Sequence, residues 1–421
     1  MKFVQILAGK TFCIPGKVRR RPTMSTSEDQ RTVTRDPMRE QESRVDRRPA
    51  RLRVLHLGFE NPWMPNAGGG SVRTHAINKR LALEGHRITV LTTGYPDAAE
   101  AWHDGVHYVP IGIGSGRTKL SRLLGYVLRL PWEVRRRRDN YDLVVEDFFA
   151  PFSTMAAPLW TNKPTVGVVQ WLHAKDKSRE YGLPFHIIER AGVRTHHRMI
   201  AVSGGTAAAL RAMNSRAGIE VIGNGLDPQA LEIEPRLGRD VVFLGRLELP
   251  GKGLDLLLDA WTRINQQVEG DLVIVGSGPN EEIFREMVQD SGCGERVRFA
   301  GWVQGANKFA MLSNARLVVI PSRQETFGLV AIEALATGTP VIAFDIPCLR
   351  EVIPVGSGWL VEPFDTVALA TEIARRYNQP ESLKAAGTEG RTFAARFDWD
   401  ALAARQATAY RAALPPRSTT R

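Results

Sequence analysis

The strongest chemical signal in this sequence is a pair of glutamates, Glu325 and Glu333, on either side of Thr326-Phe327-Gly328-Leu329. The apolar run Leu317–Ile320 predicts a strand before them, and a helix should begin near Gly328. A helix N-terminus offers free N–H groups and partial positive charge to an anion. If the segment is mostly helical, the two carboxylates lie about 12 Å apart along the axis, so they cannot hold the same atom. They can accept hydrogen bonds from hydroxyls at two ends of an extended ligand with an anionic middle. A nucleotide sugar has this layout; the alternative is an ordinary amphipathic helix with a glutamate at each end.

Two cations, Arg246 and Lys252, occur in Gly245-Arg246-Leu247 and Lys252-Gly253, in a predicted loop directly after a strand. A leaving diphosphate needs such positive charge as its oxygen becomes more negative. The alternative is a pair of solvated surface cations.

Two glycine-rich turns follow predicted strands. Gly68-Gly69-Gly70-Ser71 precedes a predicted helix. Its backbone could approach a ligand closely, and the N-terminus of the helix would favour an anionic group of that ligand. A tight turn explains the same residues. Gly276-Ser277-Gly278 lacks the third glycine of a dinucleotide fingerprint, since Glu281 stands there. We interpret it as a strand-to-helix turn. A dehydrogenase function would have this turn as its single support, so the sequence argues for it only weakly.

Alternating strand and helix patterns predict two doubly wound α/β domains with parallel sheets, Rossmann-like in form. Ligands of such sheets bind beyond the carboxyl ends of the strands, so two facing domains would make a cleft. The first half has predicted strands at Leu52–Phe59, Arg87–Thr92, Val106–Pro110, Leu143–Glu146, Thr165–Gln170 and Met199–Val202, with a last element beginning at Val221–Ile222. The second half has predicted strands at Val241–Gly245, Leu272–Val275, Val297–Phe299, Leu317–Ile320 and Val341–Ala343. The predicted organisation is an N-terminal extension (1–50), a first Rossmann-like domain (51–225), a linker (226–239), a second Rossmann-like domain (240–397) and a C-terminal helix with a tail (398–421).

Composition excludes several other classes of protein. The three cysteines are widely spaced and lack a C-x-x-C pattern, which argues against a disulfide framework or zinc site and fits a reducing cytosol. No apolar run approaches the ~18 residues of a membrane span. The short apolar stretch Met1–Gly9 lacks the basic region and cleavage site of a signal peptide. Residues 17–50 are polar and Arg-rich, which predicts disorder; a start at Met24 or Met38 stays open.

The net charge of +11 is concentrated in two segments. Residues 1–50 contribute +6 and residues 117–138 contribute +7, so the remainder is slightly acidic. Two local patches argue against a nucleic-acid-binding face. In 117–138, apolar residues recur at helical spacing between arginines: Leu120, Leu123, Leu124, Val127 and Leu128. Such a helix could lie on an anionic membrane, or it could pack its apolar face on the sheet and leave its arginines in water.

Together these motifs resemble the retaining glycosyltransferase family 4, which has the GT-B fold. The resemblance covers about residues 52–412, and its most specific part is the E-x7-E spacing of Glu325 and Glu333. It is carried further by Gly68–Gly70, Gly245-Arg246-Leu247, Lys252-Gly253, Ile222-Gly223-Asn224-Gly225-Leu226-Asp227, Glu333-Ala334-Leu335-Ala336 and Gly338-Thr339-Pro340-Val341.

The resemblance implies a role for each matching position. Arg246 and Lys252 would neutralise the donor diphosphate, and Glu325, with the backbone of Phe327, Gly328 and Leu329, would hold the donor sugar. Glu333 would hold the ribose hydroxyls. Gly69 and Gly70 would border the diphosphate and the acceptor. His173, which follows Gln170-Trp171-Leu172, matches a histidine near the reacting sugar, although a single histidine is more often structural.

The family implies hexose transfer with retention from a UDP or GDP sugar, with no cofactor and no essential metal. No Asp-x-Asp motif with neighbouring ligands occurs here, and positive side chains would supply the electrostatic stabilisation that a metal gives elsewhere. The implied reaction is a front-face transfer in which the leaving phosphate helps to deprotonate the acceptor. The expected location is the cytoplasm, with peripheral contact at an anionic membrane through 117–138 and no nucleic-acid partner.

One departure from the family pattern bears on the sugar. Relatives often carry a glycine pair after Val341-Ile342-Ala343-Phe344, where this chain has Asp345-Ile346-Pro347. The hexose, the nucleobase, the acceptor and the oligomeric state therefore stay open. Two other functions are an epimerase of the same fold, which would need a further acid–base set, and a non-catalytic sugar-nucleotide-binding protein, which the complete set of charged residues disfavours.

Overall fold

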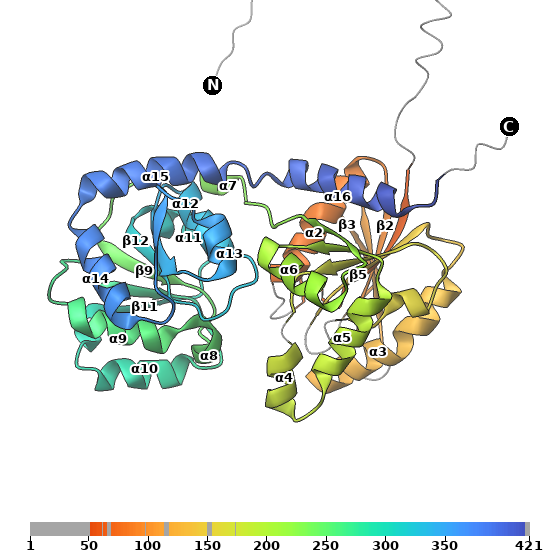
Figure 1. Cartoon of the computed structure of the whole chain (residues 1–421), viewed down its shortest axis with the longest axis horizontal. Helices are drawn as coiled ribbons and strands as arrows, with labels where there is room; N and C mark the ends of the chain where they lie inside the picture. The colour runs from red at the N-terminus through yellow and green to blue at the C-terminus, as the bar shows by residue number, and fades with distance from the viewer. Residues whose placement is uncertain are drawn as a thin grey trace, which may run out of the picture. The chain divides into compact units, whose positions relative to one another are not determined.

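An eight-stranded sheet is built from the first half of the chain, in the order β3-β4-β2-β1-β5-β6-β7-β8 (Figure 1). Every neighbouring pair is parallel except β3 with β4, which is antiparallel. The central strands are rich in valine, leucine and isoleucine and buried on both faces, as expected when helices cover both sides of a parallel sheet. The strands are β1 (Arg53–Leu57), β2 (Arg87–Thr93), β3 (Ala101–His103), β4 (Val106–Ile111), β5 (Leu143–Asp147), β6 (Thr165–Val169), β7 (Arg198–Ala201) and β8 (Gly218–Val221).

The computed structural model describes residues 51–60, 62–64, 69–96, 98–112, 118–149, 154–172 and 174–416. The predicted extension 1–50, Gly68 and His173 lie outside these ranges. Among the helices in them, none combines the length and the apolar character that crossing a bilayer requires.

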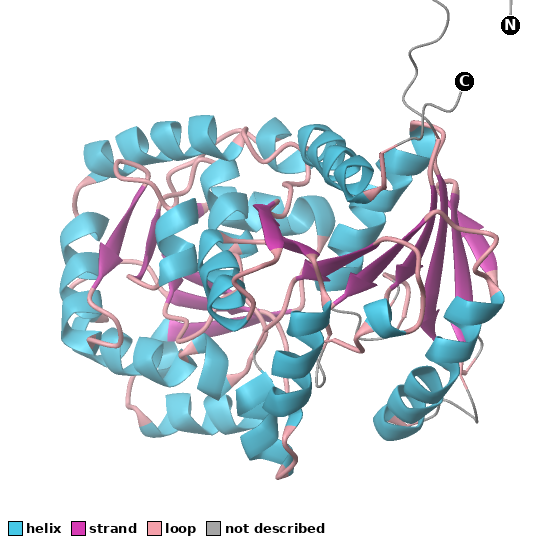
Figure 2. Ribbon diagram, turned by 45° about the vertical axis from the view of Figure 1, so that its right-hand side comes forward, coloured by secondary structure: helices cyan, strands magenta, loops and turns pink. Residues whose placement is uncertain are grey.

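Helices cover the two faces of this first sheet in distinct sets (Figure 2). Ile77 of α2 and Tyr410 of α16 share a buried cluster with Val90 of β2, so α2 and α16 cover one face. Tyr126 of α3 packs with Leu91 of β2 on the opposite face. The helices are α2 (Gly69–Leu83), α3 (Lys119–Arg136), α4 (Ala174–Tyr181), α5 (Phe185–Thr195), α6 (Gly204–Met213) and the last helix, α16 (Trp399–Ala413), with the 3-10 turn η1 (Ala157–Leu159).

A six-stranded, wholly parallel sheet follows, in the order β11-β10-β9-β12-β13-β14. Its strands are β9 (Asp240–Leu244), β10 (Leu272–Val275), β11 (Val297–Gly301), β12 (Ala315–Ile320), β13 (Val341–Phe344) and β14 (Gly358–Val361). The other elements of this half are α7 (Gln229–Glu232), α8 (Leu249–Lys252), α9 (Leu254–Ile264), α10 (Glu281–Asp290), η2 (Gly294–Arg296), α11 (Gly305–Ser313), α12 (Leu329–Ala336), α13 (Pro347–Val352), α14 (Thr366–Tyr377) and α15 (Pro380–Ala394).

The predicted α/β class with parallel sheets is confirmed, and three local predictions were wrong. Val221–Ile222 does not begin an element; Val221 ends β8. The predicted helix start near Gly328 is confirmed by α12, which begins at Leu329, but Glu325 lies before this helix, so the assumption of a mostly helical E-x7-E segment fails. Lys252 is not in a loop but ends the one-turn helix α8. In addition, β3 and β14 were not predicted; both are short and carry no long apolar run.

Candidate active site

Lys252 and Glu325 lie together beyond the carboxyl ends of two adjacent strands. The Lys252 ammonium donates to Glu325 Oε1, and the Ser322 hydroxyl donates to the same oxygen at 3.0 Å. Lys252 follows β9 and Glu325 follows β12, and these strands are neighbours in the second sheet. The two side chains keep 26% and 16% of their surface exposed, so solvent or a ligand can reach the pair. Two of the predicted site residues therefore form one charged unit at the edge where ligands of parallel sheets bind.

The backbone around Gly253 fixes Lys252 opposite Glu325. Gly253 has φ +65°, and a Cβ there would lie 2.0 Å from the carbonyl oxygen of Pro321, so only glycine fits. The backbone amide of Arg323 also donates to Gly251 O at 2.9 Å. The two segments that carry the charged pair are thus held in direct backbone contact.

An ion pair between Arg323 and Asp255 also supports the backbone contact between the segments that carry Lys252 and Glu325. The guanidinium of Arg323 donates to both carboxylate oxygens of Asp255, at 2.7 and 2.6 Å. Burial raises the pKa of Asp255, but the hydrogen bond and charge of Arg323 outweigh it and leave that pKa lowered. Asp255 therefore stays ionised and anchors the segment that leads to Glu325.

Arg246 is exposed on the loop after β9 and makes no ion pair with any residue in the described ranges. The next residue, Leu247, is buried, and its amide donates to Ser277 O at 3.0 Å. A Cβ on Gly276 would lie 1.9 Å from Gly245 O, and one on Gly278 would lie 2.3 Å from Leu247 O. The Gly276–Gly278 turn thus allows two backbones to meet, and it presents Arg246 to solvent; this agrees with its interpretation as a structural turn.

The start of α12 lies close to Glu325 in sequence and is tightly packed. Gly328 caps this helix with φ +93°, and a Cβ there would lie 2.8 Å from Leu349 Cδ2. The ring of Phe327 is buried, and a Cβ on Gly223 would lie 2.6 Å from it. The backbone from Gly328 through Leu329 precedes the helical hydrogen-bond ladder, whose first bond joins Ala331 N to Gly328 O. Free amides at this position suit the anionic part of a ligand.

Glu333 is buried and paired with Lys308, a residue that the sequence analysis missed. Lys308 Nζ lies 2.7 Å from Glu333 Oε1. Burial raises the pKa of Glu333, Lys308 offsets part of this effect, and Asp227 adds to it. The only sequence signal for Lys308 is one lysine in an otherwise uncharged helix, Gly305–Ser313.

Cys348 and Asp345 line the segment where this chain departs from the family pattern. The Cys348 thiol donates to Glu325 O at 3.0 Å, and burial with the nearby Glu325 charge raises the pKa of this thiol to about 12. Asp345 accepts from Arg350 at 2.7 Å, and this hydrogen bond lowers the pKa of Asp345. The segment after β13 is therefore tied by side-chain bonds where a glycine pair would leave open backbone.

Gly69 and Gly70 form the first turn of α2, at the carboxyl edge of the first sheet. Nothing lies within 4 Å of a Cβ built on Gly69, so packing does not demand glycine there. Gly70 faces Gln170, whose Oε1 would lie 3.4 Å from a Cβ. Gly68 and His173 were predicted for this side of the site, and the structure does not describe them.

Behind the Gly69–Gly70 turn runs a buried chain of polar groups that the sequence did not reveal. Gln170 Nε2 donates to Thr74 Oγ1 at 3.2 Å, and Thr74 donates to Asp147 at 2.5 Å. The Asp147 carboxylate also lies 3.1 Å from His56 Nε2. These residues come from α2 and three different strand ends, so their proximity depends on the fold and has no local motif.

In the described part of the chain, no group of three or more His, Cys, Asp or Glu side chains lies together as metal ligands would.

Two family models match different halves of this chain. The model described as "Glycosyltransferase Family 4" matches residues 67–230, and "Glycosyl transferases group 1" matches residues 238–379. Among curated proteins, a phosphatidyl-myo-inositol mannosyltransferase of Mycobacterium leprae is 28% identical over 372 residues, which is 83% of this chain and 94% of the relative.

Solved structures show the same fold. Sucrose-phosphate synthase from Thermosynechococcus elongatus superposes with a TM-score of 0.75 at 23% identity, covering 86% of this chain and 99% of that one. The Anabaena protein HepE, solved with UDP and glucose, gives a TM-score of 0.67 at 19% identity, covering 85% of this chain and 98% of HepE. Gly69 and Gly70 lie within the first matched range, and Arg246, Lys252, Glu325 and Glu333 lie within the second. This chain belongs to glycosyltransferase family 4 and is a glycosyltransferase of the GT-B fold.

Proposed function

We propose that this enzyme moves a hexose-type sugar from a UDP or GDP sugar to an acceptor, with retention and without an essential metal ion. The observation that carries the proposal is the charged unit of Lys252 and Glu325 beside the open amides of α12. A nucleoside diphosphate leaves with increased negative charge on its oxygens, and a fixed ammonium with free amides stabilises that charge. The exposed Arg246 adds a second cation on the same edge of the sheet.

Each predicted residue has a role in this reaction. Lys252 and Arg246 neutralise the diphosphate as the bond between the anomeric carbon and the phosphate oxygen breaks. Glu325 accepts hydrogen bonds from sugar hydroxyls, and Glu333 does so from the ribose. The acceptor hydroxyl attacks the same face of the sugar, and its proton passes to the leaving phosphate. Gly69 and Gly70 border the diphosphate and acceptor, and we propose His173 beside the reacting sugar.

The acceptor is an envelope polysaccharide, a lipid-linked sugar or a small glycoside. One relative is named for mannosyl transfer to phosphatidyl-myo-inositol and another for glycogen synthesis, so glycosyltransferases similar to this chain include both lipid-directed and polysaccharide-directed enzymes. Peripheral contact with an anionic membrane at the cytoplasmic face would suit an acceptor held by lipid.

Helix α3 supports such contact on the segment 117–138. Tyr126 and Leu130 are buried against the sheet, whereas Leu124, Leu128 and Trp132 are exposed on the other side of the helix. One side of the helix therefore packs on the sheet, and the exposed apolar side chains on another side support the proposed membrane contact. The guanidiniums of Arg129 and Arg136 lie 4.6 and 4.5 Å from the Trp132 ring. An amphipathic ring flanked by cations suits the headgroup region of a bilayer.

The proposal is tested by donor turnover. The full chain is incubated with a panel of UDP and GDP sugars in EDTA, and release of nucleoside diphosphate is measured with and without acceptor sugars. One donor should be consumed, and NMR of the first product should show the anomeric configuration of the donor. Inversion would refute the retaining mechanism, strict dependence on Mg²⁺ would refute metal independence, and conversion of a sugar nucleotide to its epimer would favour an isomerase.

A further inference from the structure

We infer that the outward side of α5 forms, together with α3, one surface that docks this chain flat on an anionic lipid bilayer. The inference rests on the proposed contact through α3 and adds a second, separate element to it. It assigns a function to a helix whose exposed residues the sequence had not singled out.

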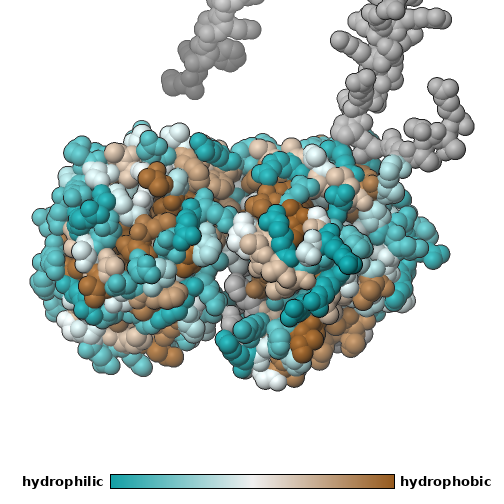
Figure 3. Space-filling model, viewed as in Figure 1, coloured by the Kyte–Doolittle hydropathy of each residue, from teal (hydrophilic) through white to brown (hydrophobic). Residues whose placement is uncertain are grey.

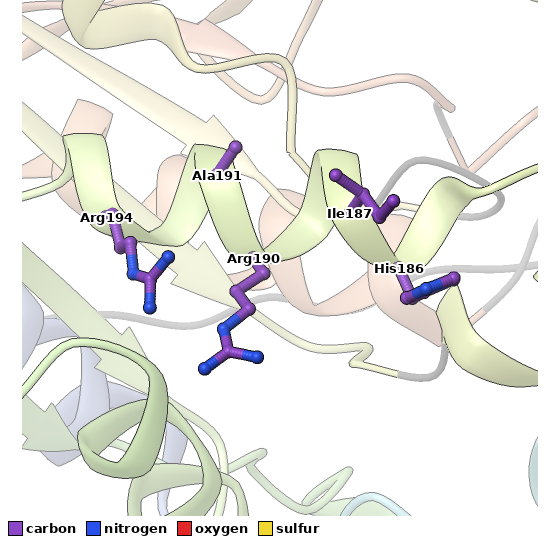
Figure 4. Close-up of a pocket in the computed structure, with 5 residues that line it drawn as sticks. All are labelled: His186, Ile187, Arg190, Ala191 and Arg194. Carbon is purple, nitrogen blue, oxygen red and sulfur yellow. The ribbon is translucent and has the colours of Figure 1, made fainter.

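Helix α5 has one buried side and one open side. Phe185, Glu189 and Val193 are buried at helical spacing. Ile187 is 60% exposed, and Ala191 is also exposed. With His186, Arg190 and Arg194 they line a shallow pocket on the outer surface (Figure 4). Figure 4 shows both guanidinium groups extending from one edge of the helix and Ile187 and Ala191 extending from the opposite edge.

The register of the sheet places α5 on the same face as α3. Leu55 and Val144 pair across β1 and β5 and belong to the cluster under α3. In the same register, Gly167 lies opposite Met199, which packs in the cluster with Val193 of α5. Strand partners point to the same side of a parallel sheet. On β5, Glu146 lies two positions after Val144 and therefore on the same face of the sheet. Glu146 pairs with Gly167 of β6, so the cluster under α3 and the cluster under α5 lie on one face.

Both helices therefore lie on the same face of the first sheet, with their exposed sides turned away from it. Between β2, which packs under α3, and β6, which packs under α5, lie three strand spacings, or about 14 Å across the sheet. In Figure 3, hydrophobic and hydrophilic groups alternate over the area where Figure 1 places α3 and α5. The opposite face of the sheet is covered by α2 and α16.

On both helices the acidic side chains are buried, whereas several arginines are exposed. Each has one acidic residue, Glu133 in α3 and Glu189 in α5, and both are buried. Arg135 and Arg136 of α3 and Arg190 and Arg194 of α5 are exposed. The exposed charges on these two helices are therefore positive, and exposed apolar side chains accompany them on the same helices; an anionic bilayer complements both properties.

Additional apolar exposure marks the beginning of α5. Leu183 is 53% exposed and Ile188 is 41% exposed, and Trp132 of α3 is 48% exposed. Single exposed apolar residues are ordinary, but a group on one face together with arginines marks an interaction surface. A bilayer accepts such side chains at two separated helices without a matching protein shape.

The first experiment measures vesicle binding of the full chain. Co-sedimentation is compared for vesicles of phosphatidylcholine alone and with phosphatidylglycerol, for the wild type and for Arg190→Glu/Arg194→Glu. Each arginine near an anionic surface contributes about fivefold to binding, so loss of both predicts at least about a 30-fold decrease. The matched control is Arg236→Glu/Arg239→Glu, which changes the charge equally at exposed linker positions and should bind like the wild type apart from a small general effect.

The second experiment reports the position of α5 directly. Cys13 is replaced by Ser, and Ile187→Cys is labelled with an environment-sensitive dye, since Cys293 and Cys348 are buried. Dye fluorescence should rise and shift to the blue on anionic vesicles. The same label at Leu83→Cys, an 84% exposed apolar position in α2 on the other face, should not respond.

The outcomes separate this inference from the proposed function. Donor turnover in solution should be the same in Arg190→Glu/Arg194→Glu as in the wild type. If neither protein turns over any donor, the result counts against the proposed enzyme function and leaves the docking inference unaffected. Vesicle binding that survives the double reversal, or an equal dye response at positions 187 and 83, would overturn docking through α5. A dye response that depends on protein concentration without lipid would assign the surface to a second copy of the chain and overturn the inference.

Discussion

Replacing Lys252 with alanine should abolish most transfer activity while leaving the fold nearly intact. The change removes the ammonium that contacts Glu325, and Glu325 keeps its hydrogen bond from Ser322 at 3.0 Å. Because both side chains are partly exposed, the lost pair should cost about 1 kcal/mol of unfolding free energy. If all 421 residues unfold together, at about 2.1 cal/mol/K of unfolding entropy per residue, that lowers the Tm by about 1 °C.

The effect on catalysis should be far larger. Removing one group that stabilises developing negative charge costs about 100- to 1,000-fold in kcat, or about 3–4 kcal/mol of transition-state free energy. Turnover of the identified donor and thermal unfolding are measured on the same preparation. Lys252→Arg keeps the charge and should retain more activity than Lys252→Ala.

A control variant separates local charge loss from a general effect. Lys384 pairs with Glu381 at 3.0 Å on the exposed surface, so Lys384→Ala should change neither quantity. The reasoning is refuted if Lys252→Ala turns over within about threefold of the wild type, or if its activity falls only in proportion to the unfolded fraction.

Three further predictions address other parts of the site. Gly69→Ala should fold at least as stably as the wild type, because its Cβ meets open space and alanine favours a helix, yet kcat/KM should fall if a ligand approaches this backbone; unchanged kinetics would remove Gly69 from the site. Burial raises the pKa of Glu333 in the folded state, so its stability contribution is largest below the unfolded pKa and is lost as pH rises through the folded pKa. Urea unfolding should therefore show the wild type losing stability relative to Glu333→Gln as pH rises from about 4 to 7, and a constant difference would contradict the shift. Cys348, with its pKa raised to about 12, should resist iodoacetamide at pH 8 in the folded state and react on unfolding; rapid native labelling would show that the thiol is accessible.

The fold was largely readable because apolar strands and the turns between them are local signals. Leu272–Val275 was predicted with its observed bounds, and each predicted strand of the second sheet overlaps an observed one. β3 and β14 were missed because runs of only three or four residues are too short to show a strand pattern by themselves, and both lie at an edge of their sheets. The sequence pattern therefore captured the buried layers better than the sheet edges.

The residues of the candidate site could be predicted from the sequence only where they belong to short motifs. The spacing of Glu325 and Glu333 was visible, but the pairing of Glu325 with Lys252 depends on the adjacency of β9 and β12. The partner of Glu333 is Lys308, 25 residues away on another helix, and no periodicity connects them. Asp147 and Thr74 are in contact although they lie 73 positions apart in the sequence. Long-range contacts of this kind come from topology, which single residues do not encode.

The return of α16 to the first sheet has a consequence for how this chain folds during synthesis. Tyr410 lies in the cluster with Ile77 and Val90, and Arg73 of α2 donates to Gln406 at 3.0 Å. The first half therefore lacks part of one face of its core until the last helix has left the ribosome. The second half has all its strands and packing helices in one continuous stretch and can complete its core earlier. Although domains made first usually fold first, here the half that is synthesised first should finish folding last.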